Sequence, residues 1–140
     1  METVFRALAD ATRLRILGLL LTGEVCVCHI HDSLRISQPK ASRHLAYLRR
    51  AGLVEARRDG LWMHYRLATV SDRVLHTIQH TVLHVLRHLD EVEKDVKRLE
   101  KATGTGCCVP PDAAQPYACC ATVDARHAKA AGRATHNSQR

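Results

Sequence analysis

The sequence has 140 residues, of which 46% are hydrophobic and only 4% aromatic, so we expect one domain with an aliphatic core. Its net charge of +7 favours an anionic partner such as nucleic acid. No stretch has the features of a signal peptide or the length of a membrane span, so we expect a cytoplasmic protein with no membrane partner.

Three short helices are predicted in the first third of the chain, because apolar residues recur there at helical spacing. Asp10 is a suitable N-cap for the second helix, and Gly23 marks its end. The third helix carries Cys26 and Cys28 and is followed by a short turn. The predicted helices cover residues 2–9, 11–21 and 24–34.

The fourth predicted helix, residues 37–48, has one apolar and one polar face. Ser37 is a suitable N-cap, Pro39 fits the first turn, and Gly52 after a basic last turn is a stop signal. A short helix, a turn and a basic second helix predict a helix-turn-helix, although an ordinary basic surface helix is the alternative. The side chains expected to contact DNA phosphates or bases are Ser37, Gln38, Lys40, Ser42, Arg43 and His44.

A β-hairpin is predicted next, from strand-forming residues 53–57 and 61–67 around a turn at residues 58–60 that contains Asp-Gly. A basic hairpin after a helix-turn-helix is typical of a wing that rests on the DNA backbone. Residues 35–66 hold eight Lys or Arg against two acidic residues. Arg57 and Arg58 near the tip therefore favour phosphate contact over a hairpin used only for packing.

A long helix is predicted from Ser71 and Asp72 to about Lys101. Its apolar residues have the 3-4-3-4 spacing of a coiled coil over four heptads: Leu75, Ile78, Val82, Val85, Leu89, Val92, Val96 and Leu99. One protomer has little left to cover this seam, so we expect a homodimer that presents two recognition helices to a two-fold operator. Four histidines also recur on this helix, where a solvated face is favoured over a metal site: His76, His80, His84 and His88.

The predicted domain spans residues 1–101. Residues 102–140 have no hydrophobic period and are rich in small and turn-forming residues, which predicts a flexible tail. Cys120 and Arg126 have the spacing of a phosphatase-like anion loop. That loop needs a preceding strand and a glycine, which are absent, and Asp124 would repel the anion, so we expect no enzyme. The tail holds two vicinal thiol pairs, Cys107-Cys108 and Cys119-Cys120.

Residues 24–30, 37–45 and 60–67 together resemble bacterial ArsR/SmtB-family repressors, most closely the arsenic-responsive branch with its ELCVCDLC motif. The resemblance covers about residues 2–100. It implies a mainly α-helical winged helix-turn-helix protein with a small β-hairpin, dimerised through its long C-terminal helix. It also implies repression of a metalloid resistance operon, with release from operator DNA by As(III) or Sb(III). Two positions depart from the motif: His29 replaces its aspartate, and His31 replaces its third cysteine.

Cys26 and Cys28 supply two of the three thiolates that trivalent arsenic prefers. In a regular helix, residues two apart point about 200° from each other. We therefore expect the helix to unwind locally on ligand binding and to weaken DNA binding. His31 is a poor ligand for arsenic. A third thiolate can come from the tail, and the candidates are Cys107, Cys108, Cys119 and Cys120.

Two alternatives stay open. In the first, the protein is a repressor of the same family that responds to zinc, cadmium or lead through Cys26, Cys28, His29 and His31. In the second, it is a metal-sequestering thiol protein, which would explain the cysteine-rich tail but not the basic charge around the wing. In a cytosolic protein the six cysteines are expected as thiols rather than disulfides.

Overall fold

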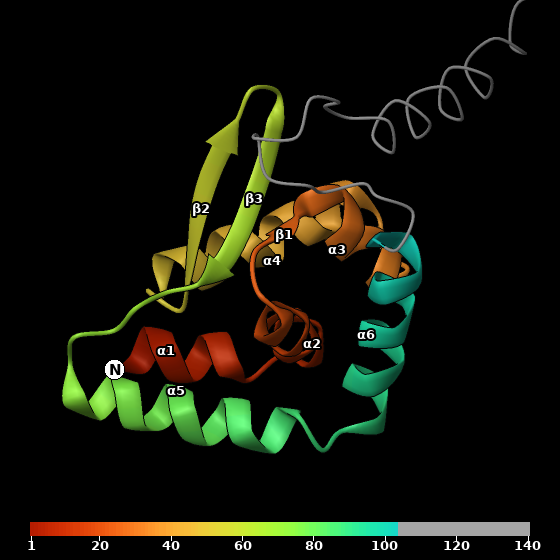
Figure 1. The fold of residues 1–140 in the computed structure, drawn as a ribbon. Helices are drawn as coiled ribbons and strands as arrows, with labels where there is room; N and C mark the ends of the chain where they lie inside the picture. The colour runs from red at the N-terminus through yellow and green to blue at the C-terminus, as the bar shows by residue number, and fades with distance from the viewer. Residues whose placement is uncertain (104–140) are drawn as a thin grey trace, which may run out of the picture. The chain divides into compact units, whose positions relative to one another are not determined.

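A computed structural model describes residues 1–103. The order of its helices and strands confirms the predicted winged helix-turn-helix fold, mainly helical with a small sheet (Figure 1). Within these residues, no helix is both long and apolar enough to cross a membrane. The tail predicted over residues 102–140, with its four cysteines, lies almost entirely outside the described residues. The elements are α1 (Glu2–Leu8), α2 (Ala11–Leu19), the 3₁₀ helix η1 (Leu20–Thr22), β1 (Val25–Cys26), α3 (Val27–Leu34), α4 (Gln38–Arg50), β2 (Val54–Asp59), β3 (Trp62–Leu67), α5 (Arg73–Leu86) and α6 (Asp90–Thr103).

The helix α2 forms the centre of the core, and its N-cap is the predicted one. The Asp10 side chain accepts a hydrogen bond from the Arg13 backbone N–H at 2.9 Å. The last turn tightens into η1, which ends at Gly23, where φ is 123° and glycine is the favoured residue. Ile16, Leu17 and Leu19 are almost completely buried.

The helix-turn-helix consists of α3, a bend and α4. Arg35 makes the bend with a left-handed backbone, φ 56°. Ser37 occupies the N-cap position of α4, but its side chain makes no capping hydrogen bond. Gly52, with φ 73°, ends α4: its N–H donates to the Arg49 carbonyl while the Leu53 N–H donates to the Leu48 carbonyl, each at 3.0 Å. These two bonds satisfy carbonyls that the helix end would otherwise leave unpaired.

The sheet has three antiparallel strands in the order β1-β3-β2 rather than two. Val25 pairs with Tyr65, and Cys26 pairs with His64. The prediction of a helix from residue 24 was therefore wrong for its first three residues. A two-residue strand is stable only against its partner, and that partner comes about forty residues later in the chain. The hairpin turn also lies later than predicted, at residues 60 and 61, because Asp59 pairs with Trp62.

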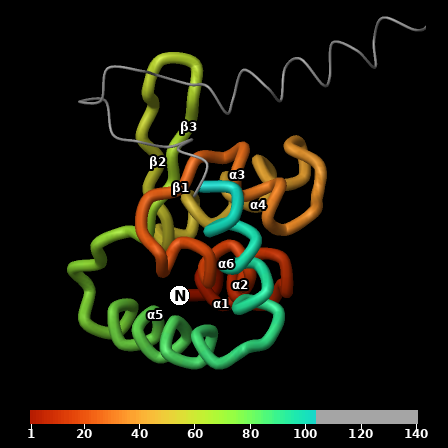
Figure 2. Tube along the Cα trace, turned by 45° about the vertical axis from the view of Figure 1, so that its right-hand side comes forward, coloured from red at the N-terminus to blue at the C-terminus, as the bar shows by residue number. Residues whose placement is uncertain are grey.

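The prediction of one continuous helix to Lys101 was wrong, because the chain breaks between α5 and α6. The helix α6 turns away from α5 and lies beside α2 (Figures 1 and 2). Val92 and Leu99 of the predicted seam are buried within the protomer, whereas Val85 and Leu89 remain 53% and 43% exposed. The seam is therefore split between the protomer's own core and an outer surface of α5.

A signal for this break is present in the sequence. Arg87 and His88 are basic residues of the kind that favour a helix end, and they are followed by three acidic residues in the first turn of α6. A 3-4 spacing of apolar residues does not distinguish one long helix from two shorter ones, so the heptad pattern hid the break.

Candidate nucleic-acid interface and thiol pair

The outer face of α4 carries positive charge that no carboxylate compensates. The helix contains no acidic residue, and Ser37, Gln38, Lys40, Ser42 and Arg43 are all exposed. Within the part of the chain that the structure describes, no ion pair involves Lys40 or Arg43; the Arg43 Nε donates only to the Pro39 carbonyl, at 3.4 Å. The opposite face packs on the core through Ala41, Leu45 and Leu48. The cationic side chains can therefore reach an external anion without breaking an internal salt bridge.

His44 does not share this exposed face. Its Nδ1 lies 3.6 Å from the Asp10 carboxylate, and only 17% of its side chain is exposed. Burial lowers the pKa of His44, against the attraction of Asp10. Arg13 lies over the ring of Tyr47, with its guanidinium carbon 4.4 Å from the ring centroid. These contacts brace α4 against the start of α2, and sequence reasoning missed them because they depend on tertiary packing.

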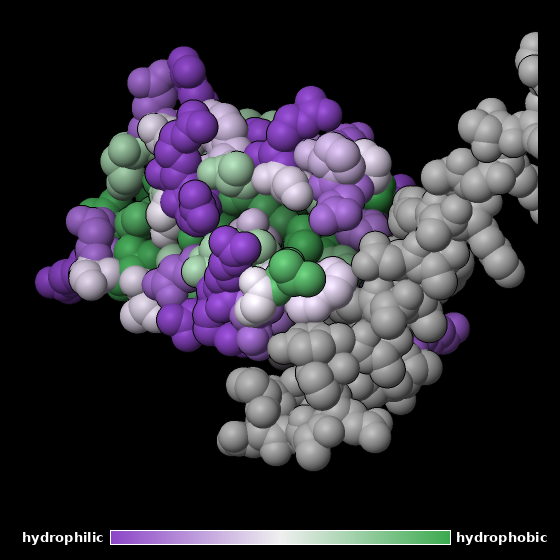
Figure 3. Space-filling view, turned by 90° about the horizontal axis from the view of Figure 1, so that it is seen from above, coloured by the Kyte–Doolittle hydropathy of each residue, from purple (hydrophilic) through white to green (hydrophobic). Residues whose placement is uncertain are grey.

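The two arginines of the wing have different environments. Arg57 donates to Glu24 at 2.6 Å and lies 3.5 Å from Asp59. Its hydrogen bond lowers the pKa of the Glu24 carboxyl, and Glu24 raises the pKa of Arg57. Arg58 has no carboxylate partner within residues 1–103 and donates to the Gly60 carbonyl at 3.1 Å. On the face that carries the hairpin tip, hydrophilic side chains predominate (Figure 3).

Cys26 and Cys28 lie with their sulfur atoms 2.9 Å apart, and both side chains are buried. Cys26 belongs to β1, with extended backbone angles of φ −68° and ψ 145°, and only Cys28 lies in α3. The premise that both thiols lie in one regular helix is therefore wrong, because the change from strand to helix already brings the two sulfur atoms together. Two sulfurs bound to one ion at about 2.3 Å in tetrahedral directions lie about 3.8 Å apart, so small rotations suffice for chelation.

The histidines near the thiols do not complete a metal site in this geometry. In residues 1–103, no three Cys, His, Asp or Glu side chains come together in an arrangement that could hold a metal ion. His31 places its Nδ1 3.3 Å from the Asp32 carboxylate. His29 is buried, and burial lowers its pKa, which favours the neutral imidazole. The four residues of the alternative zinc site, Cys26, Cys28, His29 and His31, are therefore not assembled here.

Three histidines of α5 and His88, which lies just beyond its end, form two neighbouring pairs of exposed side chains. The ring centroids of His76 and His80 are 6.2 Å apart, and those of His84 and His88 are 5.4 Å apart. The four tail cysteines, Cys107, Cys108, Cys119 and Cys120, lie outside the described residues.

Residues 10–56 match the family described as bacterial regulatory protein, arsR family. Over 65 residues the chain is 54% identical to the arsenic resistance transcriptional regulator ArsR1 of Pseudomonas putida, which covers 46% of this chain and 51% of that protein. It is 54% identical over 66 residues to the arsenical resistance operon repressor of Escherichia coli, covering 46% of this chain and 56% of that one. The chain thus spans only about half the length of these two curated relatives.

A solved structure matches more completely. It is the homodimeric winged helix-turn-helix DNA-binding domain of Mb0332 from Mycobacterium bovis, described as a possible ArsR-family transcriptional regulator. Its sequence is 36% identical, the match covers 64% of this chain and 81% of that one, and the TM-score is 0.51.

Proposed function

The chain belongs to the ArsR family of bacterial regulatory proteins, and on that basis we propose that it is a transcriptional repressor that binds operator DNA as a homodimer. We further propose that As(III) or Sb(III) releases it by binding the thiolates of Cys26 and Cys28. The observation that carries the proposal is the exposed positive face of α4, whose Lys40 and Arg43 form no ion pair within the described residues. This helix is the second helix of the helix-turn-helix, and it follows the bend at Arg35 that ends α3, the helix that carries Cys28. The named functions of two similar proteins, an arsenic resistance transcriptional regulator and an arsenical resistance operon repressor, support it.

In this proposal α4 lies in the major groove. Gln38 and Arg43 are suited to base edges, while Ser37, Lys40 and Ser42 are suited to phosphates. Arg58 at the wing is available for the sugar-phosphate backbone. Arg57 must exchange its Glu24 partner for a phosphate before it can contribute, so it makes a smaller net gain than Arg58.

Two contacts link the thiol pair to this surface. Cys28 lies in α3, which leads through the bend at Arg35 into α4. Cys26 lies in β1, which pairs with the wing strand β3 at His64. A ligand that draws the two sulfurs into a new geometry therefore acts on the recognition helix and on the wing together, which supports a coupling between thiol binding and DNA release.

We propose that the third thiolate comes from the tail, because the neighbouring His31 is a poor ligand for arsenic and is directed to Asp32. Arsenic-edge X-ray absorption counts the bound sulfurs directly. We expect three in the full chain and two after truncation following Thr105. Three sulfurs in the truncated protein would show that the tail cysteines are not ligands.

The dimer partner is proposed to be a second copy of this chain, seated on the outer apolar surface of α5. Val74 and Val85 are more than half exposed there, and Leu89, in the link between α5 and α6, is 43% exposed. Burying such side chains between two copies removes apolar surface from water.

The test is a titration of the complex between the protein and fluorescent DNA of its own promoter, followed by anisotropy. As(III), Sb(III), Zn(II), Cd(II) and Pb(II) are added separately. Release by As(III) and Sb(III) supports the proposal. Release only by Zn(II), Cd(II) or Pb(II) would move the protein to the alternative repressor class, and thiol-dependent metal binding without DNA binding would indicate a sequestering protein.

A further inference from the structure

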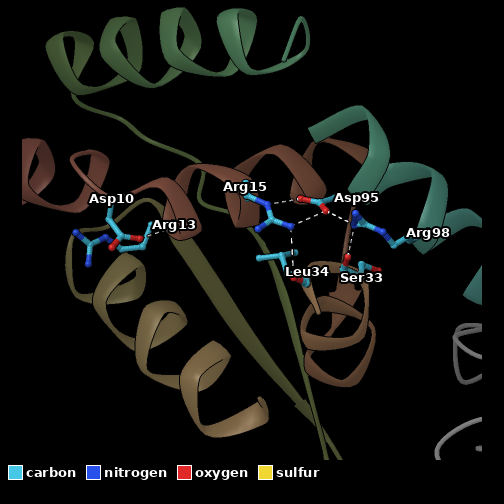
Figure 4. Close-up of polar contacts among 7 residues, drawn as sticks. All are labelled: Asp10, Arg13, Arg15, Ser33, Leu34, Asp95 and Arg98. Atoms are coloured by element: carbon cyan, nitrogen blue, oxygen red, sulfur yellow. Dashed lines mark hydrogen bonds and ion pairs between the residues drawn. The ribbon is translucent and has the colours of Figure 1, made fainter. Parts of the chain in front are cut away.

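A completely buried carboxylate joins α6 to two arginines. Asp95 of α6 has 0% exposure. Arg15 of α2, 80 positions away in the chain, binds it with two parallel hydrogen bonds, Nε to Oδ2 at 2.7 Å and Nη2 to Oδ1 at 2.8 Å. Arg98, one turn further along α6, also donates to Oδ1. We call these three side chains the Arg15–Asp95–Arg98 cluster (Figure 4).

Both arginines also reach the carboxyl end of α3. Arg98 donates to the Ser33 carbonyl at 2.8 Å, and Arg15 lies 3.4 Å from the Leu34 carbonyl. The last carbonyls of a helix have no partner within the helix, and they carry the negative end of its dipole. The backbone N–H groups of Arg35 and Ile36 satisfy the two carbonyls before these, at Asp32 and His31. The cluster therefore caps the Ser33 and Leu34 carbonyls, which the backbone N–H groups of the bend do not reach.

The position of this cap matters because Arg35, with its left-handed backbone, follows directly, and α4 begins at Gln38. Only residues 35–37 separate α3 from α4, so a small rotation at the end of α3 changes the direction of the exposed face of α4. Figure 4 shows the two guanidinium groups on either side of Asp95, with Ser33 and Leu34 below them.

Apolar packing also attaches α6 to the core. Taking ions out of water is costly, and a buried ion pair is often no more stabilising than apolar side chains of similar size. Val92 and Leu99 already anchor α6 by apolar burial. The bidentate pairing instead fixes a direction, because a planar guanidinium binds a carboxylate in only a few geometries.

We propose that Asp95 is a positioning residue for DNA recognition: it holds Arg15 and Arg98 on the last carbonyls of α3 and so sets the direction in which α4 leaves the bend. The effect on DNA binding rests on the proposed function. The effect of Asp95 on the bend between α3 and α4 does not depend on that function. Asp95 contacts no DNA in this account and acts only through the two arginines.

The experiment compares Asp95→Asn and Arg98→Gln with the control Val92→Ala in the full chain. Arg98→Gln retains the Arg15–Asp95 pair, so it can still be measured if Asp95→Asn does not fold. Val92→Ala weakens the packing of α6 but leaves the cluster intact. Hydrogen exchange of individual backbone amides is followed by NMR, and affinity for promoter DNA is measured by anisotropy well below the unfolding temperature.

We expect both cluster variants to speed exchange at the Arg35 and Ile36 amides by roughly tenfold or more. Arg98→Gln removes the charge-assisted hydrogen bond to the Ser33 carbonyl, and Asp95→Asn weakens the hold on the two arginines that reach the end of α3. Amides of β2 and β3 should keep their wild-type rates, and DNA affinity should fall by about tenfold. The Val92→Ala control should show neither the local increase at the bend nor the loss of affinity.

Exchange at Arg35 and Ile36 that changes no more than exchange in β2 and β3 would overturn the inference. So would faster exchange at the bend with unchanged DNA affinity, because the cluster would then stabilise α3 without directing α4. A wild-type chain that binds no promoter DNA would refute the proposed function, and the exchange rates would still decide whether the cluster fixes the bend.

Discussion

Val92 of α6 lies directly against Gly18 of α2. A β-carbon at position 18 would be 2.5 Å and 2.8 Å from the two Cγ atoms of Val92. Glycine inside a helix costs about 1 kcal/mol relative to alanine, so this position gives up helix stability to let α6 approach closely. The contact lets α6 pack closely on α2, while the pairing of Asp95 with Arg15 depends on its own hydrogen bonds.

The first prediction concerns this contact. Gly18→Ala should lower the free energy of unfolding by about 1–3 kcal/mol, because the added methyl group overpacks the interface with Val92. Val92→Ala in the same chain should recover part of the loss, since it removes the atoms that clash. Urea denaturation of both single variants and the double variant measures the coupling. A Gly18→Ala protein as stable as wild type would contradict the close packing of α2 and α6.

The second prediction concerns the thiols. Cys26→Ser and Cys28→Ser should each bind promoter DNA like the wild type but no longer leave it on addition of arsenite. Each variant keeps only one of the two buried thiolates, and one thiolate cannot chelate As(III). Anisotropy titration measures the release, and release of each variant by added salt is the control for an ordinary complex. If both variants respond to arsenite at the wild-type concentration, the sensing site lies elsewhere, and the tail cysteines become the first candidates.

The third prediction separates base contacts from phosphate contacts. Arg43→Ala should cost about 1–3 kcal/mol of specific binding per half-site. Arg58→Ala should weaken binding to all sequences and reduce the salt dependence by about one unit of slope. Arg6→Ala is the matched control, because Arg6 is an exposed arginine of α1 paired with Glu2. Equal affinity of Arg43→Ala and wild type for the promoter would remove α4 from the proposed interface.

The fourth prediction concerns assembly. Val85→Asp combined with Leu89→Asp should give folded monomers, because both side chains are exposed in the protomer and the new carboxylates would be buried only between two copies. Sedimentation velocity at micromolar concentration measures the state, and circular dichroism checks the fold. Lys97→Asp, a charge change on the exposed surface of α6, should leave the dimer intact. A wild-type monomer would reject the proposed dimer.

The fifth prediction concerns pH. The hydrogen bond from Arg57 lowers the pKa of Glu24 in the folded protein. The pair therefore contributes stability that is complete above the unfolded pKa of Glu24 and is lost as the pH falls through the folded value. Glu24→Gln and Arg57→Gln should each flatten the acid side of the stability curve, between about pH 5 and pH 3. Urea unfolding at several pH values tests this, and an unchanged curve in both variants would refute the pairing.

Several parts of the fold could be predicted because their signals are local. Asp10 capped α2 as expected, and the apolar spacing of Ala41, Leu45 and Leu48 correctly identified the buried face of α4. Gly52 ended α4 as predicted, because only a residue that tolerates positive φ closes that helix easily.

The candidate site was predictable in its residue types but not in its geometry. Cys26 and Cys28 were recognised from their spacing, but their 2.9 Å separation depends on Cys26 lying in a strand. His44 was assigned to the polar face from its helical position, yet the nearby Asp10 draws its side chain inward. The spacing of residues in the sequence indicated neither that Cys26 lies in a strand nor that His44 contacts Asp10.

The sequence by itself determined which segments become helices or hairpin strands, because caps, glycines and apolar periods act within a few residues. Tertiary structure alone decided two further features: that β1 pairs with β3, and that Asp95 lies between two arginines. Each of these depends on contacts between residues far apart in the chain, such as the 80 positions between Arg15 and Asp95. Such contacts form only when the whole chain has closed around its core, so local patterns do not specify them.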